Sequence, residues 1–179
     1  MEKIRTVCII AMAVALGALV LAAANNSYAQ NYRAKLDGKN EVPPLNTTSE
    51  GVINFKTKGD MMTWKMNVTG MNDATAVNIH QGKVGEKGDI IVDLMKVSKH
   101  KDTAKGMLMR GNVTDAGLKG ALVGKTLADL QTSIANGDTY VNLVTSDHPD
   151  GELRGQIKLK GGDNATSSAN STSSTNNTS

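Results

Sequence analysis

The chain has 179 residues, and its 20 lysines and arginines against 17 aspartates and glutamates give a formal net charge of +3 at pH 7. This small surplus is scattered among acidic residues, which argues against nucleic-acid binding, for which basic residues cluster on one face. The single cysteine, Cys8, lies in the N-terminal segment. Without that segment the chain has no disulfide, no thiolate nucleophile and no cysteine-type zinc site.

Residues 1–29 have the pattern of an export signal peptide. Lys3 and Arg5 give a basic start, residues 7–24 are uncharged and mostly apolar, and residues 27–29 form a small-x-small cleavage signature. An uncleaved membrane anchor is the alternative, because the apolar run approaches the ~18–20 residues that span a bilayer. The small residues of its second half favour cleavage. Either way, we expect the rest of the chain to be secreted or held at the cell surface.

Residues 30–160 are predicted to form one β domain, of a size usual for a single core. Apolar and polar residues alternate with the period of two that a strand imposes. Met62, Trp64 and Met66 form the clearest apolar stripe. We interpret this stripe as core and not as a ligand site, because methionine is a pliable core filler. The predicted strands cover residues 32–37, 51–57, 61–68, 74–80, 90–95, 106–113, 140–145 and 152–157.

Two other segments complete the predicted fold. Leu127, Leu130 and Ile134 recur at helical spacing before Gly137, which predicts one short helix. Residues 147–151, Asp-His-Pro-Asp-Gly, have the chemistry of a tight turn between the last two strands. The sequence therefore predicts an all-β antiparallel fold, either an immunoglobulin-like sandwich or a small barrel, with one short helix.

Residues 161–179 are almost entirely Ser, Thr, Asn, Gly and Ala, so we expect a disordered tail that cannot offset its ordering entropy by burying apolar surface. The tail is dense in Asn-x-Ser/Thr sequences, and the β domain has three more. The candidate glycosylation sites are Asn46, Asn67, Asn112, Asn164, Asn170, Asn176 and Asn177.

The most concentrated set of polar side chains on the predicted strands is Asn78, His80, Asn142, Glu152 and Arg154. On a strand, Glu152 and Arg154 share a face about 7 Å apart, near enough for a cross-strand or water-bridged ion-pair network. We interpret the set first as a brace that ties the last hairpin to its neighbours through carboxylates or carbonyls. A ligand or metal site that uses His80 is the alternative.

No catalytic motif accompanies this set. The sequence has no Gly-x-Ser-x-Gly elbow, no Walker loop and no His-Glu-x-x-His helix. A copper–zinc dismutase needs several imidazoles to hold two metals, whereas this chain has three histidines in all. We therefore expect a non-catalytic protein without a cofactor, and we assign no metal ligand beyond His80 as a weak candidate.

Three separated stretches together resemble the CHRD (chordin-type) domain family. They are Leu-Asp-Gly-Lys-Asn-Glu-Val-Pro-Pro at 36–44, Val-Asn-Ile-His-Gln-Gly at 77–82, and residues 140–156 with Pro-x-Gly-Glu-Leu-Arg-Gly-Gln at 149–156. The resemblance implies an extracellular, immunoglobulin-like β domain, which in animals accompanies a secreted antagonist of growth factors and in microbes has a largely undefined function. Asn78 and Val144 stand where the family usually has histidine, so His80 alone is kept from a set of three.

Two functions from different classes remain open at this point. The first is an exported, non-catalytic module that binds an extracellular protein or glycan through loops at the ends of the β domain. The second is an extracellular metal or small-ligand binder centred on His80. Neither involves nucleic acid, and contact with a membrane is expected only through the N-terminal segment if it is not cleaved.

Overall fold

The computed structural model describes residues 29–160, except for 72 and 104. The predicted signal peptide, apart from its last residue, and the predicted disordered tail with its four candidate glycosylation sites lie outside the described residues. So does Cys8.

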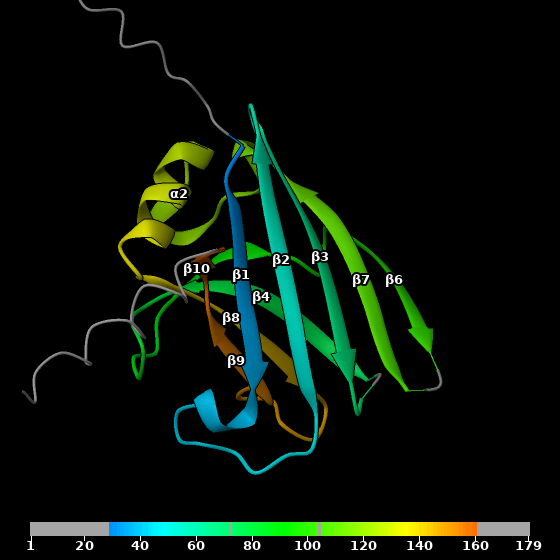
Figure 1. Ribbon diagram of the computed structural model, residues 1–179. Coiled ribbons are helices and arrows are strands. Elements are labelled where there is room, and N and C mark those ends of the chain that lie inside the picture. Colours follow the sequence, from blue (N-terminus) through cyan, green and yellow to red (C-terminus); the bar gives the residue numbers. More distant parts are fainter. Residues whose placement is uncertain (1–28, 72, 104, 161–179) are drawn as a thin grey trace, which may run out of the picture.

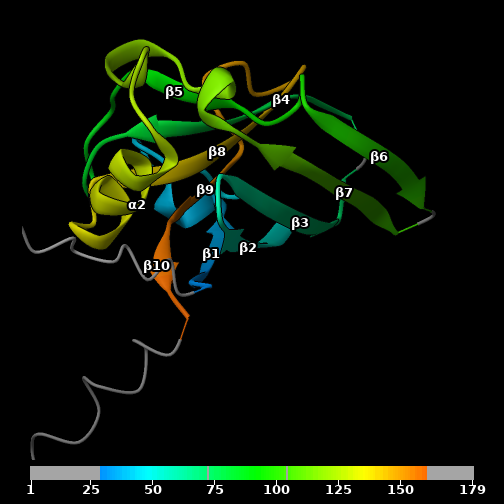
Figure 2. The ribbon, with the colours of Figure 1, turned by 90° about the horizontal axis from the view of Figure 1, so that it is seen from above.

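Ten antiparallel strands form one continuous sheet, with the order β5-β4-β8-β9-β1-β2-β3-β7-β6 and with β10 also paired to β1. Figures 1 and 2 show that this sheet curls strongly, so that β4, β8 and β9 pass behind β1, β2 and β3. The strands are β1 (Asn31–Asp37), β2 (Glu50–Lys58), β3 (Met61–Thr69), β4 (Ala74–Gln81), β5 (Ile90–Asp93), β6 (Ser98–Thr103), β7 (Gly106–Val113), β8 (Thr139–Thr145), β9 (Leu153–Gln156) and β10 (Lys158–Leu159).

The all-β antiparallel prediction is confirmed, and its arrangement is that of a curled half-barrel. Hydrogen-bonded pairing continues from β5 at one end to β6 at the other. The specific immunoglobulin-like sandwich is not confirmed, because all ten strands belong to this one sheet. Twist and curling allow a single sheet to cover its own apolar face, which a flat sheet would leave exposed to water.

The core lies between the two halves of the curled sheet. Trp64, Phe55 and Tyr32 are buried on one half, and Ile79 and Leu143 are buried on the other. The predicted stripe of Met62, Trp64 and Met66 is core, as expected, with each side chain at most 2% exposed. Methionine thus fills space that the few aromatic side chains leave.

One short α-helix, α2 (Leu127–Ala135), packs its apolar side chains into the core, as the spacing predicts. Asp129 closes its N-terminus by accepting the backbone N–H of Thr126 at 2.8 Å. Gly137 follows the helix with φ +74°, the left-handed conformation that ends many helices. Single turns of 3-10 helix occur at η1 (Gly38–Asn40), η2 (Asp115–Gly117) and η3 (Gly120–Leu122).

No strand is predicted between residues 96 and 105, but β6 lies in that segment at the edge of the sheet. Exposed Lys99 and Lys101 on an edge strand discourage pairing with other chains, and such a strand need not show an apolar face.

Between residues 29 and 160, no described helix is long and apolar enough to cross a membrane.

Candidate functional site

Strand register brings the predicted polar residues together on one face of β4, β8 and β9. Asn78 lies opposite Asn142, and Asn142 lies opposite Arg154, so the three form one row across the strands. His80 lies opposite Tyr140 in the next row. Residues directly opposite one another point to the same side of a sheet, and the apolar residues between them point to the other side, into the core.

Arg154 is the residue around which this face is organised. It is only 3% exposed, and its Nη2 donates to the backbone carbonyls of Lys83 at 2.9 Å and Glu86 at 2.6 Å. Its guanidinium carbon lies 3.5 Å from the centre of the Tyr140 ring. A buried cation needs such partners, because removal from water is costly unless the charge is solvated by the protein. Arg154 therefore fixes the connection between β4 and β5 against β9.

His80 and Tyr140 hold the same connection from the neighbouring strands. Their rings stack with centroids 5.0 Å apart and an interplanar angle of 13°. Nδ1 of His80 lies 2.9 Å from the carbonyl oxygen of Gly88, and the Tyr140 hydroxyl accepts the Gly88 N–H at 3.2 Å. Because the carbonyl can only accept, Nδ1 carries the proton. The pKa of His80 is lowered by burial, against the opposing effect of the Gly88 carbonyl, which favours a neutral ring at pH 7.

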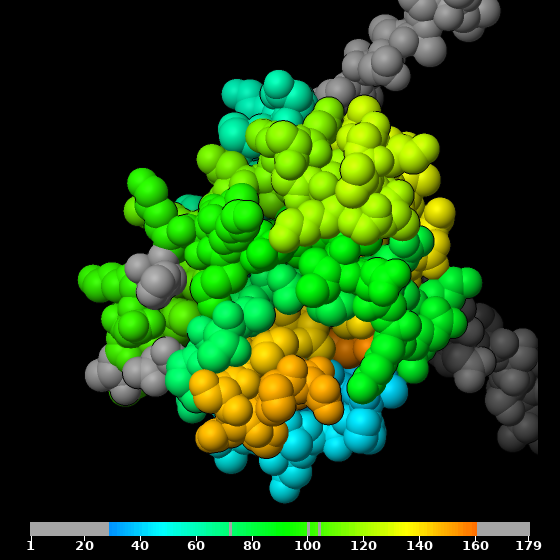
Figure 3. Space-filling view, turned by 180° about the vertical axis from the view of Figure 1, so that it is seen from behind, coloured from blue at the N-terminus to red at the C-terminus, as the bar shows by residue number. Residues whose placement is uncertain are grey.

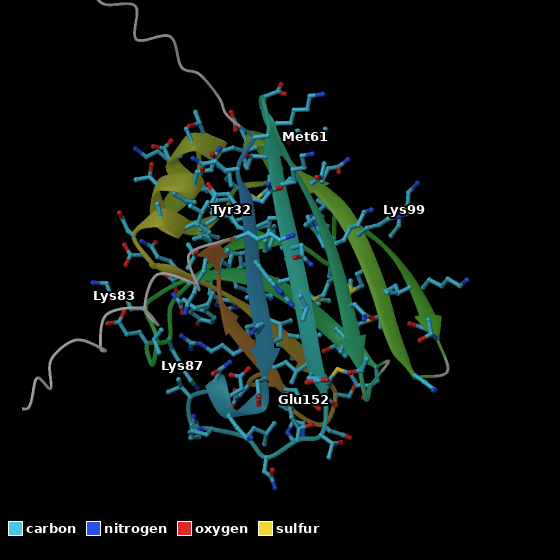
Figure 4. All side chains as sticks on the ribbon, in the orientation of Figure 1. Tyr32, Met61, Lys83, Lys87, Lys99 and Glu152 are labelled. Atoms are coloured by element: carbon cyan, nitrogen blue, oxygen red, sulfur yellow. The ribbon has the colours of Figure 1, made fainter. Side chains whose placement is uncertain are left out.

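Gln156 completes the attachment of this connection. Its Nε2 donates to the carbonyl of Gly82 at 2.9 Å and to that of Gly137 at 2.6 Å, so it links the β4–β5 connection to the end of the helix. We call residues 82–89 the braced loop. Lys83 and Lys87, labelled in Figure 4, belong to this loop, and both are exposed.

A buried carboxylate from outside the predicted set, Glu41, lies against the same face. Its two oxygens lie 3.1 and 3.2 Å from Nδ2 of Asn142, which donates to them. Burial raises the pKa of Glu41, although the charge of Arg154 and the amide of Asn142 favour its ionised form. Within the described residues, Oδ1 of Asn142 is buried without a hydrogen-bond partner.

Glu152 has a separate role from Arg154. Its carboxylate accepts the hydroxyls of Thr47 at 2.9 Å and Thr145 at 2.8 Å, and it thereby attaches the segment after η1 to the β8–β9 hairpin. No direct ion pair joins Glu152 and Arg154 among the described residues, because the arginine donates to backbone carbonyls and lies against an aromatic ring. The one ion pair in the described part of the chain joins Lys119 and Asp93 at 3.2 Å.

The close packing of these segments is visible on the reverse side of the molecule. In Figure 3 the β8–β9 turn, in orange, lies directly beside the residues that follow β1, in light blue. Gly151 in this turn has φ +127°, and a Cβ atom there would lie 2.5 Å from Nδ2 of Asn142 and 2.9 Å from Oε1 of Glu41. The turn therefore requires glycine for both its conformation and its contacts.

The surroundings of His80 do not resemble a metal centre. Among the described residues, no group of three or more His, Cys, Asp or Glu side chains is placed to hold a metal ion. One ring nitrogen of His80 already faces a carbonyl, and its ring face is stacked on Tyr140. The three sequons inside the domain are accessible, since Asn46, Asn67 and Asn112 are all exposed.

A groove of about 700 Å³ adjoins the braced loop on the outer side of β1 and β10. Sequence reasoning did not find it, although one signal was present: cations alternate at 33 and 35 near the start of the domain and at 158 and 160 near its end. The residues that line it are Arg33, Lys35, Lys39, Asn40, Glu41, Val42, Val84, Gly85, Arg154, Gln156, Lys158, Leu159 and Lys160.

The sequence model of a protein family described as the CHRD domain matches residues 32–157, from the second residue of β1 to just past the end of β9. No curated protein and no solved structure matches the chain.

Proposed function

Because the chain belongs to the CHRD domain family, we propose that it is an exported, non-catalytic module that binds a protein or glycan partner at the cell surface or in the extracellular medium. The observation that carries the proposal is that buried and half-buried polar side chains on this face hold loops in place. Arg154, Gln156 and Glu152 each have partners that fix a loop, and the surface these loops shape is a groove. A rigid scaffold that presents loops around a concave surface is a usual arrangement for recognition.

Export is supported by the pattern of residues 1–29, which agrees with an extracellular site of action. The accessible sequons at Asn46, Asn67 and Asn112 agree with it as well, because each could be glycosylated in a host with that machinery.

The experiment uses the full chain expressed in cells that export it. The N-terminus of the protein found outside the cytoplasm is determined by mass spectrometry, and the purified, labelled protein is then returned to intact cells. We expect an N-terminus near residue 30 and saturable retention on the cells. Prior digestion of the cells with protease abolishes retention if the partner is protein, and periodate abolishes it if the partner is glycan. A cytoplasmic chain, or no retention, contradicts the proposal.

The alternative function, a metal or small-ligand site centred on His80, has less support. The ring nitrogen Nδ1 of His80 already faces the backbone carbonyl of Gly88, and the side-chain amide of Asn142 donates to Glu41. Calorimetric titration with copper, zinc and calcium, repeated on His80→Ala, tests this alternative. Submicromolar binding that depends on His80 would favour metal binding over the proposal above. If none of the three metals produces heat of binding, the metal-binding alternative is excluded.

A further inference from the structure

We infer that the groove beside β1 and β10 binds an acidic polysaccharide, one that carries carboxylate or sulfate groups. The inference rests on the proposed function and names the class of its partner. Residues of β1, β10, the β4–β5 connection and the segment 39–42 line the groove. In Figure 1, β10 and the β4–β5 connection lie to the left of β1.

Charge is the first argument. The groove is lined by Arg33, Lys35, Lys39, Arg154, Lys158 and Lys160, with Glu41 as the only acid among its lining residues. The whole chain has 20 basic and 17 acidic residues, so this is a strong local excess. Arg154 is occupied by carbonyls, but Lys35, Lys39, Lys158 and Lys160 are exposed and free to meet an anion. A concave surface lined by one sign of charge raises the local concentration of the opposite ion.

An unsatisfied donor is the second argument, and it is independent of net charge. The Nε atom of Arg33 is buried and has no hydrogen-bond partner within the described residues. Arg33 also lies directly opposite Lys158 across β1 and β10, which places two cations side by side. A carboxylate or sulfate oxygen between them would accept the Nε–H and offset the repulsion, since guanidinium groups form charge-assisted hydrogen bonds with oxyanions.

The shape of the surface favours an extended ligand. Arg33 and Lys35 also line a second hollow of about 340 Å³, which continues across β2 and β3 as far as Thr69 and also includes Asp37 and Glu50 in its lining. A single small anion would occupy only the cationic centre, whereas a polysaccharide can run from one hollow to the other. Exposed Val84 and Leu159 at the groove offer apolar surface for the C–H faces of sugar rings.

Two other kinds of polyanion fit less well. Single-stranded nucleic acid is usually held by stacking bases on aromatic side chains, and the groove lining contains none. An acidic peptide commonly adds a strand to a free sheet edge, but β1 is already paired with β2 on one side and with β9 and β10 on the other. The test therefore includes single-stranded nucleic acid and an acidic peptide as competing ligands.

The chain provides a matched control pair. Lys65 on β3 and Arg110 on β7 also lie directly opposite one another, and both are exposed, but neither lines the groove or the second hollow. The double variants Arg33→Gln/Lys158→Gln and Lys65→Gln/Arg110→Gln remove the same charge from two cross-strand pairs. Only the first removes the buried unsatisfied donor and the cations of the groove.

Binding of the purified full chain is measured at 0.15 M salt to oligogalacturonate, to a heparin oligosaccharide, to neutral dextran, to poly-glutamate and to a single-stranded oligonucleotide. We expect saturable binding to oligogalacturonate, to heparin or to both, which distinguishes carboxylate from sulfate as the preferred group. Affinity should fall at least about tenfold in Arg33→Gln/Lys158→Gln and stay within about twofold of wild type in the control. The glycan should also raise the Tm of wild type more than that of the groove variant.

The inference is overturned if neither acidic glycan binds, if the control variant loses as much affinity as the groove variant, or if the oligonucleotide or poly-glutamate binds as tightly with the same dependence on Arg33 and Lys158. Folding is checked by circular dichroism, which should be unchanged because Lys158 is exposed and Arg33, which is half-buried, does not belong to the apolar core. If labelled protein is still retained on cells while purified glycans fail to bind, the inference fails and the proposed function stands. If the purified glycans bind but labelled protein is not retained on cells, the inference stands and the proposed function fails.

Discussion

The guanidinium of Arg154 and the ring of Tyr140 are in van der Waals contact, with the Arg154 carbon 3.5 Å from the ring centroid. Strand β8 lies between β4 and β9, so His80 and Arg154 approach the tyrosine from its two sides. Three side chains from three strands thus form a stack, and every member of it also contacts the backbone of the braced loop.

Replacing Arg154 by methionine should release the braced loop. The variant keeps the apolar volume but loses two charge-assisted hydrogen bonds and the contact of a cation with an aromatic ring. We expect the free energy of unfolding to fall by about 3 kcal/mol. Chemical denaturation measures the loss, and hydrogen exchange should show faster exchange of amides in residues 82–89.

Arg110→Met is the control for this change. Arg110 is exposed on β7 and its removal should alter stability by at most about 0.5 kcal/mol, without any effect on exchange in the braced loop. Equal losses in the two variants would show that Arg154 does not brace the loop.

Gly151→Ala tests the turn that closes β8 and β9. The substitution places a Cβ atom against the Asn142 amide and Glu41 in a backbone conformation that suits glycine. We expect a loss of at least about 3 kcal/mol, because a clash with buried polar groups adds to the conformational cost.

Gly59→Ala separates these two contributions. Gly59 has φ +60° in the β2–β3 turn, and nothing lies within 4 Å of a Cβ atom there. Its substitution should cost only about 1–2 kcal/mol, the penalty for a left-handed alanine. Similar thermal stabilities for the two alanine variants would mean that the contacts around Gly151 are not restrictive.

Glu152→Leu should be more damaging than Glu152→Gln. Leucine leaves the buried hydroxyl of Thr145 and that of Thr47 without their acceptor, for which we expect a loss of about 2–3 kcal/mol. Glutamine retains an oxygen, and its amide can donate to a hydroxyl that reverses its role, so about 1 kcal/mol is expected. Equilibrium unfolding of both variants decides the point, and an equal loss would argue against the hydroxyl contacts.

Much of the fold could be predicted from the sequence because its signals are local. Alternation in residues 61–68 and 32–37 marks strands with one buried face, and the helix has both an apolar period and a stop at Gly137. The order of strands in the sheet depends on contacts between distant segments, and no local pattern encodes it. Strand β6 was missed since an edge strand can be polar on both faces.

The candidate site, too, could be predicted only in part from the sequence. Asn142, Glu152 and Arg154 were found because polar residues stand out on predicted strands, and the suggestion that an arginine could pair with carbonyls was correct. The partner of Asn142 is Glu41, 101 residues earlier in the chain, in a loop whose position only the three-dimensional structure reveals. The groove was missed for the same reason, since its cations come from both ends of the domain.

Glu41→Gln should make the protein less sensitive to pH. In the folded chain burial raises the pKa of this carboxyl above its ordinary value of 4.5, which the unfolded chain retains. Between these two pKa values the unfolded chain has released the proton while the folded chain still holds it. Stability from this group is therefore fully present below about pH 4.5 and is lost as pH rises through the folded pKa.

A glutamine at position 41 has no proton to release, and its amide can donate to Oδ1 of Asn142, which lacks a partner in the described residues. The Tm of Glu41→Gln relative to wild type should therefore rise between pH 4 and pH 7, as followed by thermal melts at constant ionic strength. Glu50→Gln, an exposed carboxyl on β2, controls for the change in net charge and should show no such trend. If the Tm difference for Glu41→Gln is flat or falls with pH, the carboxyl is already ionised in the acid range and Asn142, with Arg154, outweighs its burial.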